Sequence, residues 1–299
     1  MPLLAILLGL ALMVPCSAAT PQDEARAREI LQRVSAEADR FWRAARDVFA
    51  RETLVQRARK PPPRFRRRGA GNQTGNDSGQ YISREIVSEY TFGVLAESPG
   101  SLYEFRQVLA VDGRPTVSAE TARQTLAIGM RSGDDRVKRA MLDRFRQQGL
   151  PGGATDFGQM ILMFTGAQLG RLEFAIGEEA WAGPDRALVL AYREKPGHES
   201  FTIFQGRHAM RQPLQGTLWV RRQDSVPLRI TMISRHQEDE RLRVHEATVD
   251  YAPSAFGLVL PVSVVHRDTA DGILLMENRF VYEEYRKFTA DSEVKFDVQ

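Results

Sequence analysis

The side chains of this sequence most suited to metal or proton chemistry are five histidines, His198, His208, His236, His245 and His266. They are spread along the chain without the close spacing of a zinc-binding HExxH helix. His236 and His245 flank the acidic stretch Glu238-Asp239-Glu240, so a hairpin there would bring two imidazoles close to carboxylates. Two imidazoles and a carboxylate can bind a transition metal, although a solvent-exposed acidic turn is the commoner arrangement. A metal-dependent hydrolase is therefore only a remote alternative.

Other catalytic patterns are missing from the sequence. It has no GxSxG nucleophile elbow, no phosphate-binding glycine loop and no Ser-x-x-Lys pair. Glu178 and Glu179 are the most obvious pair of carboxylates, but neighbouring residues on a strand point to opposite faces and cannot serve one substrate. The aromatic residues Trp42, Trp181 and Trp219 suit a hydrophobic core better than the wall of a lipid cavity. We predict a protein without enzymatic activity and without a cofactor.

The N-terminus has the pattern of a secretory signal. Leu3 to Val14 form an apolar run, and Ser17-Ala18-Ala19 follow it at the position of a cleavage site. The run is shorter than the roughly 20 residues that span a bilayer, and no Lys or Arg precedes it. We expect residues 1–19 to be removed and the protein to be periplasmic or secreted. Cys16 is the only cysteine, so the mature chain would have no disulfide; Pro15 disfavours lipid attachment at Cys16.

The charge is nearly balanced, with 41 Lys and Arg against 38 Asp and Glu, which gives no indication of nucleic-acid binding. The basic residues gather in residues 59–80, where three prolines and a Gly-Asn-rich run predict a flexible loop. A solvated insertion is the simpler interpretation of this loop. Peripheral contact with an anionic membrane is the alternative, through Arg64, Arg66, Arg67 and Arg68.

The segment 20–58 is predicted to form a helix and then a first strand. Thr20 can cap the helix, and apolar residues recur after it at helical spacing, namely Ile30, Leu31, Val34, Ala38, Phe41, Ala45 and Val48. One face of this helix is apolar and needs a sheet to cover it.

The remainder, residues 81–299, is predicted to be a meander of antiparallel strands with a helical lid over residues 118–166. Apolar residues alternate with polar ones from Arg171 to Phe288, and turn residues such as Asp112-Gly113 and Asp271-Gly272 separate the strands. No helix-sized segment lies between the late strands, which excludes a parallel βαβ sheet. The fold class is therefore mainly β (α+β): one large curved antiparallel sheet with helices on its concave face, in one domain with residues 20–58.

Short motifs stand out in the late strands: Gly216-Thr217-Leu218-Trp219-Val220, a polar turn, Val226-Pro227-Leu228-Arg229-Ile230, and later Leu260-Pro261 with a closing strand from Tyr282 to Phe288. They resemble motifs of the LolA-like and LppX-like periplasmic carriers of the outer-membrane lipoprotein-sorting type. The resemblance implies an open half-barrel whose apolar concavity, covered by helices, holds lipid or acyl chains.

We therefore predict a non-enzymatic envelope protein that binds a lipid, an acyl chain or a lipidated partner. The alternative is a structural or regulatory interaction module whose sheet is filled by its own helices. The residues expected to contact the ligand alternate along four strands or lie on a short helix predicted over Asp156 to Phe164. They are Phe174, Ile176, Leu188, Leu190, Leu218, Val220, Leu228, Ile230, Met160 and Phe164.

Overall fold

The computed structural model describes residues 21–60, 80–150, 156–205 and 208–287. The predicted signal segment with Cys16, and the part of the basic loop that carries Arg64, Arg66, Arg67 and Arg68, lie outside the described residues.

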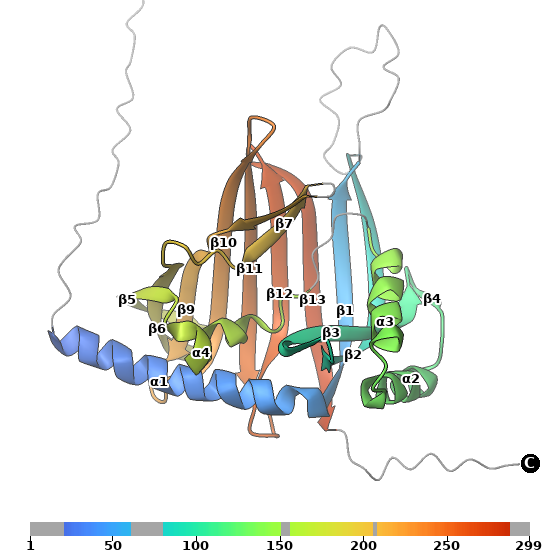
Figure 1. Cartoon of the computed structure of the whole chain (residues 1–299), viewed down its shortest axis with the longest axis horizontal. Coiled ribbons are helices and arrows are strands. Elements are labelled where there is room, and N and C mark those ends of the chain that lie inside the picture. Colours follow the sequence, from blue (N-terminus) through green and yellow to red (C-terminus); the bar gives the residue numbers. More distant parts are fainter. Residues whose placement is uncertain (1–20, 61–79, 151–155, 206–207, 288–299) are drawn as a thin grey trace, which may run out of the picture.

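One open antiparallel sheet of eleven strands dominates the molecule (Figure 1). Its spatial order is β4-β3-β2-β1-β13-β12-β11-β10-β9-β6-β5, so β4 and β5 are the edges and the sheet does not close. The strands are β1 (Val48–Arg59), β2 (Tyr81–Leu95), β3 (Ser98–Val111), β4 (Arg114–Pro115), β5 (Leu172–Ala182), β6 (Asp185–Glu194), β9 (Gln215–Arg221), β10 (Pro227–Glu238), β11 (Arg241–Pro253), β12 (Val259–Ala270) and β13 (Ile273–Lys287). The predicted fold class is confirmed.

The strands that come first and last along the chain, β1 and β13, are neighbours in the middle of the sheet. Leu54 of β1 lies opposite Phe280 of β13 and, on its other side, opposite Ile86 of β2. All three side chains are fully or almost fully buried. The N-terminal strand therefore joins the early strands to the late meander in one sheet.

Tight turns join the strands as the Asp-Gly pairs predict. Asp112 and Gly113 between β3 and β4, and Asp271 and Gly272 between β12 and β13, all have positive φ angles of 49° to 76°. A two-residue hairpin turn of this type requires positive φ at both positions, which Asp and Gly tolerate best. These turns fix the register of the strands that they join.

The helices divide between two places (Figure 1). The long helix α1 (Pro21–Ala44), the 3₁₀ turn η3 (Met160–Phe164) and the short α4 (Gly166–Leu169) lie at the concave face of the late strands, and the 3₁₀ turn η1 (Ala45–Asp47) follows α1 and contacts β2. By contrast, α2 (Ala119–Arg131) and α3 (Asp135–Gln148) pack against β2 and β3 at one end of the sheet. The segment 118–166, predicted to be one lid, therefore divides between two places: α2 and α3 at the end of the sheet, and η3 at its concave face. The helix expected over Asp156 to Phe164 is a shorter 3₁₀ turn.

A further small sheet, β7 (Phe201–Gln205) paired with β8 (His208–Gln212), crosses in front of β10 to β12 in Figure 1. Both of its strands lie within the stretch from Arg171 to Phe288 that the sequence predicts to be a meander. None of the helices in the described part of the chain is long and apolar enough to cross a membrane.

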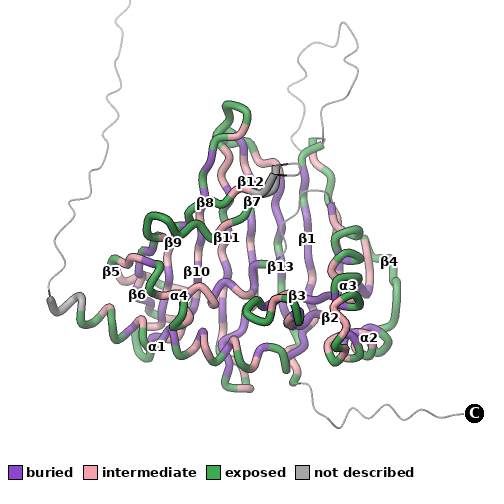
Figure 2. The backbone as a smooth tube through the Cα atoms, in the orientation of Figure 1, coloured by how far each residue is buried: buried purple, intermediate pink, exposed green. Residues whose placement is uncertain are grey.

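Burial follows the strands in alternation (Figure 2). The large core joins the concave face of the sheet to the apolar side of α1, where Val34, Ala38 and Phe41 are completely buried. A smaller core under α2 and α3 contains Phe105, Leu126 and Met141. Each helical layer thus has its own apolar contact with the sheet.

Gly216 marks a close approach between β9 and β10. A Cβ added there would overlap the carbonyl oxygen of Thr231 and lie 3.0 Å from the hydroxyl oxygen of Tyr192. We expect Gly216→Ala to lower the free energy of unfolding by about 1–3 kcal/mol, because the backbone of β10 must move. Urea denaturation measures the loss, and Gly133→Ala is the control, since its Cβ meets nothing within 4 Å. Equal stability of the two variants would contradict the close approach.

Candidate functional site

Strand register brings five of the predicted ligand-contacting residues of β6, β9 and β10 onto one face. Leu190 lies opposite Leu218, and Leu218 lies opposite Ile230. All three side chains have no solvent exposure. Leu188 and Val220 form the next pair along the same strands and are almost as deeply buried. These five side chains are the floor of the concave face.

The remaining predicted residues lie around this floor. Phe164 of η3 contacts the rings of Tyr192, with centroids 5.3 Å apart, and of Phe174, at 6.2 Å. Phe174 and Ile176 belong to the edge strand β5 and are only partly buried. Met160 is buried in the same cluster, whereas Leu228 is buried outside it.

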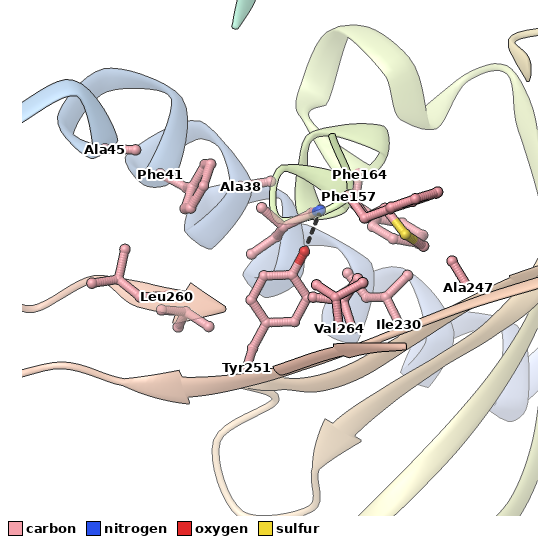
Figure 3. Packing of buried hydrophobic residues seen from close by; sticks show 14 of the residues in the cluster. Ala38, Phe41, Ala45, Phe157, Phe164, Ile230, Ala247, Tyr251, Leu260 and Val264 are labelled. Atoms are coloured by element: carbon pink, nitrogen blue, oxygen red, sulfur yellow. Dashed lines mark hydrogen bonds between the residues drawn. The ribbon is translucent and has the colours of Figure 1, made fainter. Parts of the chain in front are cut away.

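Segments of this same chain cover the floor. Figure 3 shows α1 contributing Ala38 and Phe41 and η1 contributing Ala45, with Phe157 and Phe164 beside them, above Ile230 and Val264 of the sheet. The hydroxyl of Tyr251 rises from β11 to meet this cover: it accepts a hydrogen bond from the backbone N–H of Ile161, 3.0 Å away. A ligand reaches the floor only where this cover gives way.

A groove of about 570 Å³ runs along the outer side of η3. Its larger apolar lining residues come from α1, β3, η3, β7 and β10 and from the loops before η3 and β9, and they are Trp42, Leu102, Phe157, Met160, Leu162, Met163, Phe201, Leu214 and Met232. Of the ten residues predicted from the sequence, Met160 lines this groove. Because Met160 also packs in the core, η3 is the wall between the groove and the floor.

Next to η3, the concave face holds a buried ionic cluster around Arg106 of β3. Arg106 Nε donates to the carboxylate of Glu52 on β1 at 2.8 Å, and Nη2 donates to Glu104 Oε2 at 2.7 Å. Nη1 donates to Asp156 Oδ1 at 3.1 Å. Arg106, Glu52 and Glu104 are nearly inaccessible to solvent, and the guanidinium carbon of Arg106 lies 4.6 Å from the centre of the Phe145 ring. One cation thus gathers three carboxylates inside an apolar surround.

Burial dominates the electrostatics of this cluster. It raises the pKa of Glu104 to about 8 even though the Arg106 charge lowers it. Burial likewise raises the pKa of Glu52 against the same opposing charge. Loss of water around a carboxylate disfavours its charged form, which is the physical cause of both shifts.

The same cluster fastens the segment before η3 to the sheet. The backbone N–H of Gln159 donates to Glu104 Oε1 at 3.2 Å, and Asp156 contacts Arg106. Gly158 lies so close to the sheet that a Cβ there would be 2.8 Å from the Tyr90 hydroxyl oxygen. The position of η3 is therefore set by polar contacts as well as by apolar packing.

Sequence reasoning missed this cluster, although a signal was present. Glu52 lies between Ala50 and Leu54 in the alternation of β1, so its side chain faces the core. Arg106 lies at a core-facing position of β3 in the same way. Residues of opposite charge at core-facing positions of different strands indicate a buried ion pair, because an isolated buried charge is very costly.

The histidines occupy different surroundings. His236 and His245 do come together, with parallel rings whose centroids are 5.5 Å apart, whereas His198 is exposed in a turn. Among the described residues, no group of three or more His, Cys, Asp or Glu side chains is arranged to hold a metal ion.

Comparison with known proteins gives little. No family model matches the sequence, and no curated protein is significantly similar to it. Among solved structures, a LolA superfamily protein from Nitrosomonas europaea matches 89% of this chain and 98% of its own, with 13% sequence identity and a TM-score of 0.29. Two folds at that TM-score superimpose only loosely, so the fold assignment rests on the sheet topology.

Replacing Arg106 by Met should lower the free energy of unfolding by about 3–5 kcal/mol, because it leaves carboxylates buried without their cation. Urea denaturation at neutral pH measures this. The control is Arg193→Met, which breaks an ion pair with Glu173 of comparable length, 2.6 Å, between exposed side chains. That pair should contribute less than about 1 kcal/mol. Similar losses in the two variants would contradict a structural role for the Arg106 cluster.

The raised pKa of Glu104 also predicts a pH dependence. The pKa of Glu in an unfolded chain is about 4.3, whereas the pKa of Glu104 in the folded protein is about 8. Between these two pH values the folded state keeps the Glu104 proton and the unfolded state has lost it. The stability that Glu104 contributes is therefore complete below the unfolded pKa and is lost as the pH rises through the folded pKa. From about pH 6.5 to about pH 8.5 we expect the free energy of unfolding to fall by about 2 kcal/mol.

Two variants test that assignment. Glu104→Gln has no proton to lose and should flatten the pH profile over this range. Glu246→Gln, at an exposed position of β11, should retain it. A profile that stays steep in the Glu104 variant would assign the titration to another group.

Proposed function

We propose that this chain is an exported carrier that holds an acyl chain, of a lipid or of a lipidated partner, in the concavity of its sheet and catalyses no reaction. The groove of about 570 Å³ along η3 carries the proposal. Its volume falls in the range of small-molecule sites, and such sites are mostly apolar with a few polar groups.

The chemistry of the groove wall supports an acyl ligand. Met160, Met163 and Met232 are three of its lining residues, and methionine side chains adapt to irregular apolar shapes. Trp42 and Phe201 add flat apolar surface. A linear hydrocarbon chain needs this kind of wall and requires no fixed pattern of polar partners.

The predicted contact residues fit this proposal as a second layer. Leu190, Leu218 and Ile230 lie beneath the cover formed by α1 and η3, so the ligand would touch them only after η3 moves. Because η3 has five residues, its displacement exposes less core than movement of the 24-residue helix α1 would. In the proposal, the groove is the entry and the floor residues are the inner wall.

Complete burial of Leu190, Leu218 and Ile230 supports the alternative, an interaction module with a self-filled core. The two proposals differ in whether the wild-type protein binds an acyl ligand at all. Export to the periplasm or medium belongs to the proposal too, and it is supported by the apolar run and small-residue site within residues 1–19.

Titration of the purified protein with a fluorescent fatty acid tests the carrier. We expect saturable binding, and we expect Met163→Asp to weaken it by about tenfold or more, because a charge placed on an apolar wall must be desolvated by the ligand. Met163 is only partly buried, at the edge of the core, so the variant should fold. The control Val137→Asp changes an exposed apolar residue of α3 that does not line the groove, and should bind normally. Absence of saturable binding to the wild type would favour the interaction module.

A further inference from the structure

Three histidines form a row across the concave face. His236 of β10, His245 of β11 and His266 of β12 stack with ring centroids 5.5 Å and 6.2 Å apart and ring planes within 1° and 7° of parallel. Each residue is at least nine-tenths buried, with exposures of 8%, 9% and 1%. Such a row is unusual on a face that, apart from the Arg106 cluster, packs mainly apolar side chains.

The row continues as a chain of hydrogen bonds over the next two strands. The Nδ2 atom of Asn278 on β13 lies 3.2 Å from His266 Nδ1, and Asn278 Oδ1 accepts from Gln56 Nε2 of β1 at 3.0 Å. Gln56 Oε1 in turn accepts from the backbone N–H of Leu150 at 2.7 Å. The chain therefore starts at a group that can only donate.

This starting point fixes the proton on His266. Because Leu150 N–H donates to the Gln56 oxygen, the Gln56 nitrogen must face Asn278, and the Asn278 nitrogen must face His266. His266 Nδ1 is then the acceptor, so in the neutral ring the proton sits on Nε2. The structure presents His266 Nε2–H as an oriented hydrogen-bond donor.

That donor is unused. Within the described residues, His266 Nε2, His245 Nε2 and both ring nitrogens of His236 have no hydrogen-bond partner and are inaccessible to solvent. An unsatisfied buried polar group costs about 1–3 kcal/mol, and nearly all such groups in folded proteins are satisfied. A row of them on an apolar floor is explained by a partner that supplies the missing hydrogen bonds.

The charges around the row select against an anionic partner. Arg243 is already engaged by Asp268 at 2.6 Å and by Glu238 at 3.0 Å, so this corner has more negative than positive charge. Burial lowers the pKa of His245 to about 4 and that of His266 to about 3. The rings are therefore uncharged at neutral pH, and they offer donors and acceptors to an uncharged group.

The row adjoins the groove. Phe157 stacks on His266 with centroids 4.6 Å apart, and the Phe201 ring lies 5.3 Å from that of His245; both phenylalanines line the groove. Met232 also lines it, and His236 follows four residues later on the same face of β10, about 13 Å along the strand. The histidines themselves do not line the groove, so the polar end of a chain bound there would reach them past the Phe157 and Phe201 rings.

We propose that the row of His236, His245 and His266 binds the uncharged polar head of the ligand, an acyl ester with free hydroxyl groups such as a monoacylglycerol. The ester carbonyl accepts from His266 Nε2–H, and the hydroxyls pair with the nitrogens of His245 and His236. This inference rests on the proposed acyl-carrier function and specifies the ligand class.

Competition against the fluorescent fatty acid at about pH 8 tests it, with 1-oleoylglycerol and oleate as competitors that share one chain. We expect wild-type protein to prefer 1-oleoylglycerol by about tenfold or more, which corresponds to about one strong hydrogen bond. His266→Leu should reduce the preference to about twofold while leaving the affinity for oleate unchanged. His198→Leu, at an exposed position, should keep the full preference.

A second measurement does not depend on a variant that folds. Nitrogen-15 NMR of the wild-type imidazoles should show the His266 Nε2 resonance moving when 1-oleoylglycerol is added. Equal affinity for the two competitors, tighter binding of oleate, or an unmoved His266 resonance would each overturn the head-group site while leaving the acyl carrier intact. Failure of both competitors and of the fluorescent fatty acid to bind would instead remove the proposed function itself.

Discussion

An open sheet of eleven strands has to bury its concave apolar face against something other than itself. A closed barrel covers its interior with its own strands, but here β4 and β5 remain as separate edges. The helix α1 and the turn η3 provide the cover, and the fully buried Leu190, Leu218 and Ile230 show how completely they do so. Any ligand site in this fold is therefore a matter of where that cover is thin. The groove beside η3 lies at such a place, because only five residues separate it from the floor.

Two groups of polar side chains interrupt the apolar face, and they differ in whether their hydrogen bonds are satisfied. Arg106 bonds with Glu52 and Glu104, and the cluster extends through Asp156 to the segment before η3. Its members satisfy each other, so its role is to position the cover. The histidine row has ring nitrogens that are buried and without partners in the described part of the chain. The first group is complete within the protein, and in our proposal the head of the bound ligand completes the second.

Much of the sheet could be predicted from the sequence because local rules govern it. Period-two alternation places Leu188 and Leu190 on one face. The Asp-Gly pairs define the turns from β3 to β4 and from β12 to β13, because few other residues adopt the positive φ angles of these turns. What could not be predicted depends on pairings between distant segments. The placement of β1 between β2 and β13 is one example, since nothing local distinguishes it from an edge strand. The division of the helices is another: the apolar faces of α2 and α3 would fit any sheet surface, and tertiary packing assigns them to β2 and β3.

The candidate site shows the same limit. The shared face of Leu190, Leu218 and Ile230 follows from alternation, but the groove is lined by residues from several helices, strands and loops, which alternation does not relate to one another. Likewise, the sequence pairs His236 with His245 across a turn, whereas His266 joins them only because β12 lies beside β11.

The direction of the hydrogen-bond chain adds a constraint that composition alone would not reveal. A backbone N–H cannot accept a hydrogen bond, so Leu150 imposes one orientation on Gln56, and through Asn278 on His266. Reversing His266 to present an acceptor would break the contact at Leu150, just beyond the end of α3. The sheet therefore offers a donor at this position for as long as α3 keeps its place. A ligand atom that meets it has to be an acceptor, which an ester carbonyl is and a hydrocarbon is not.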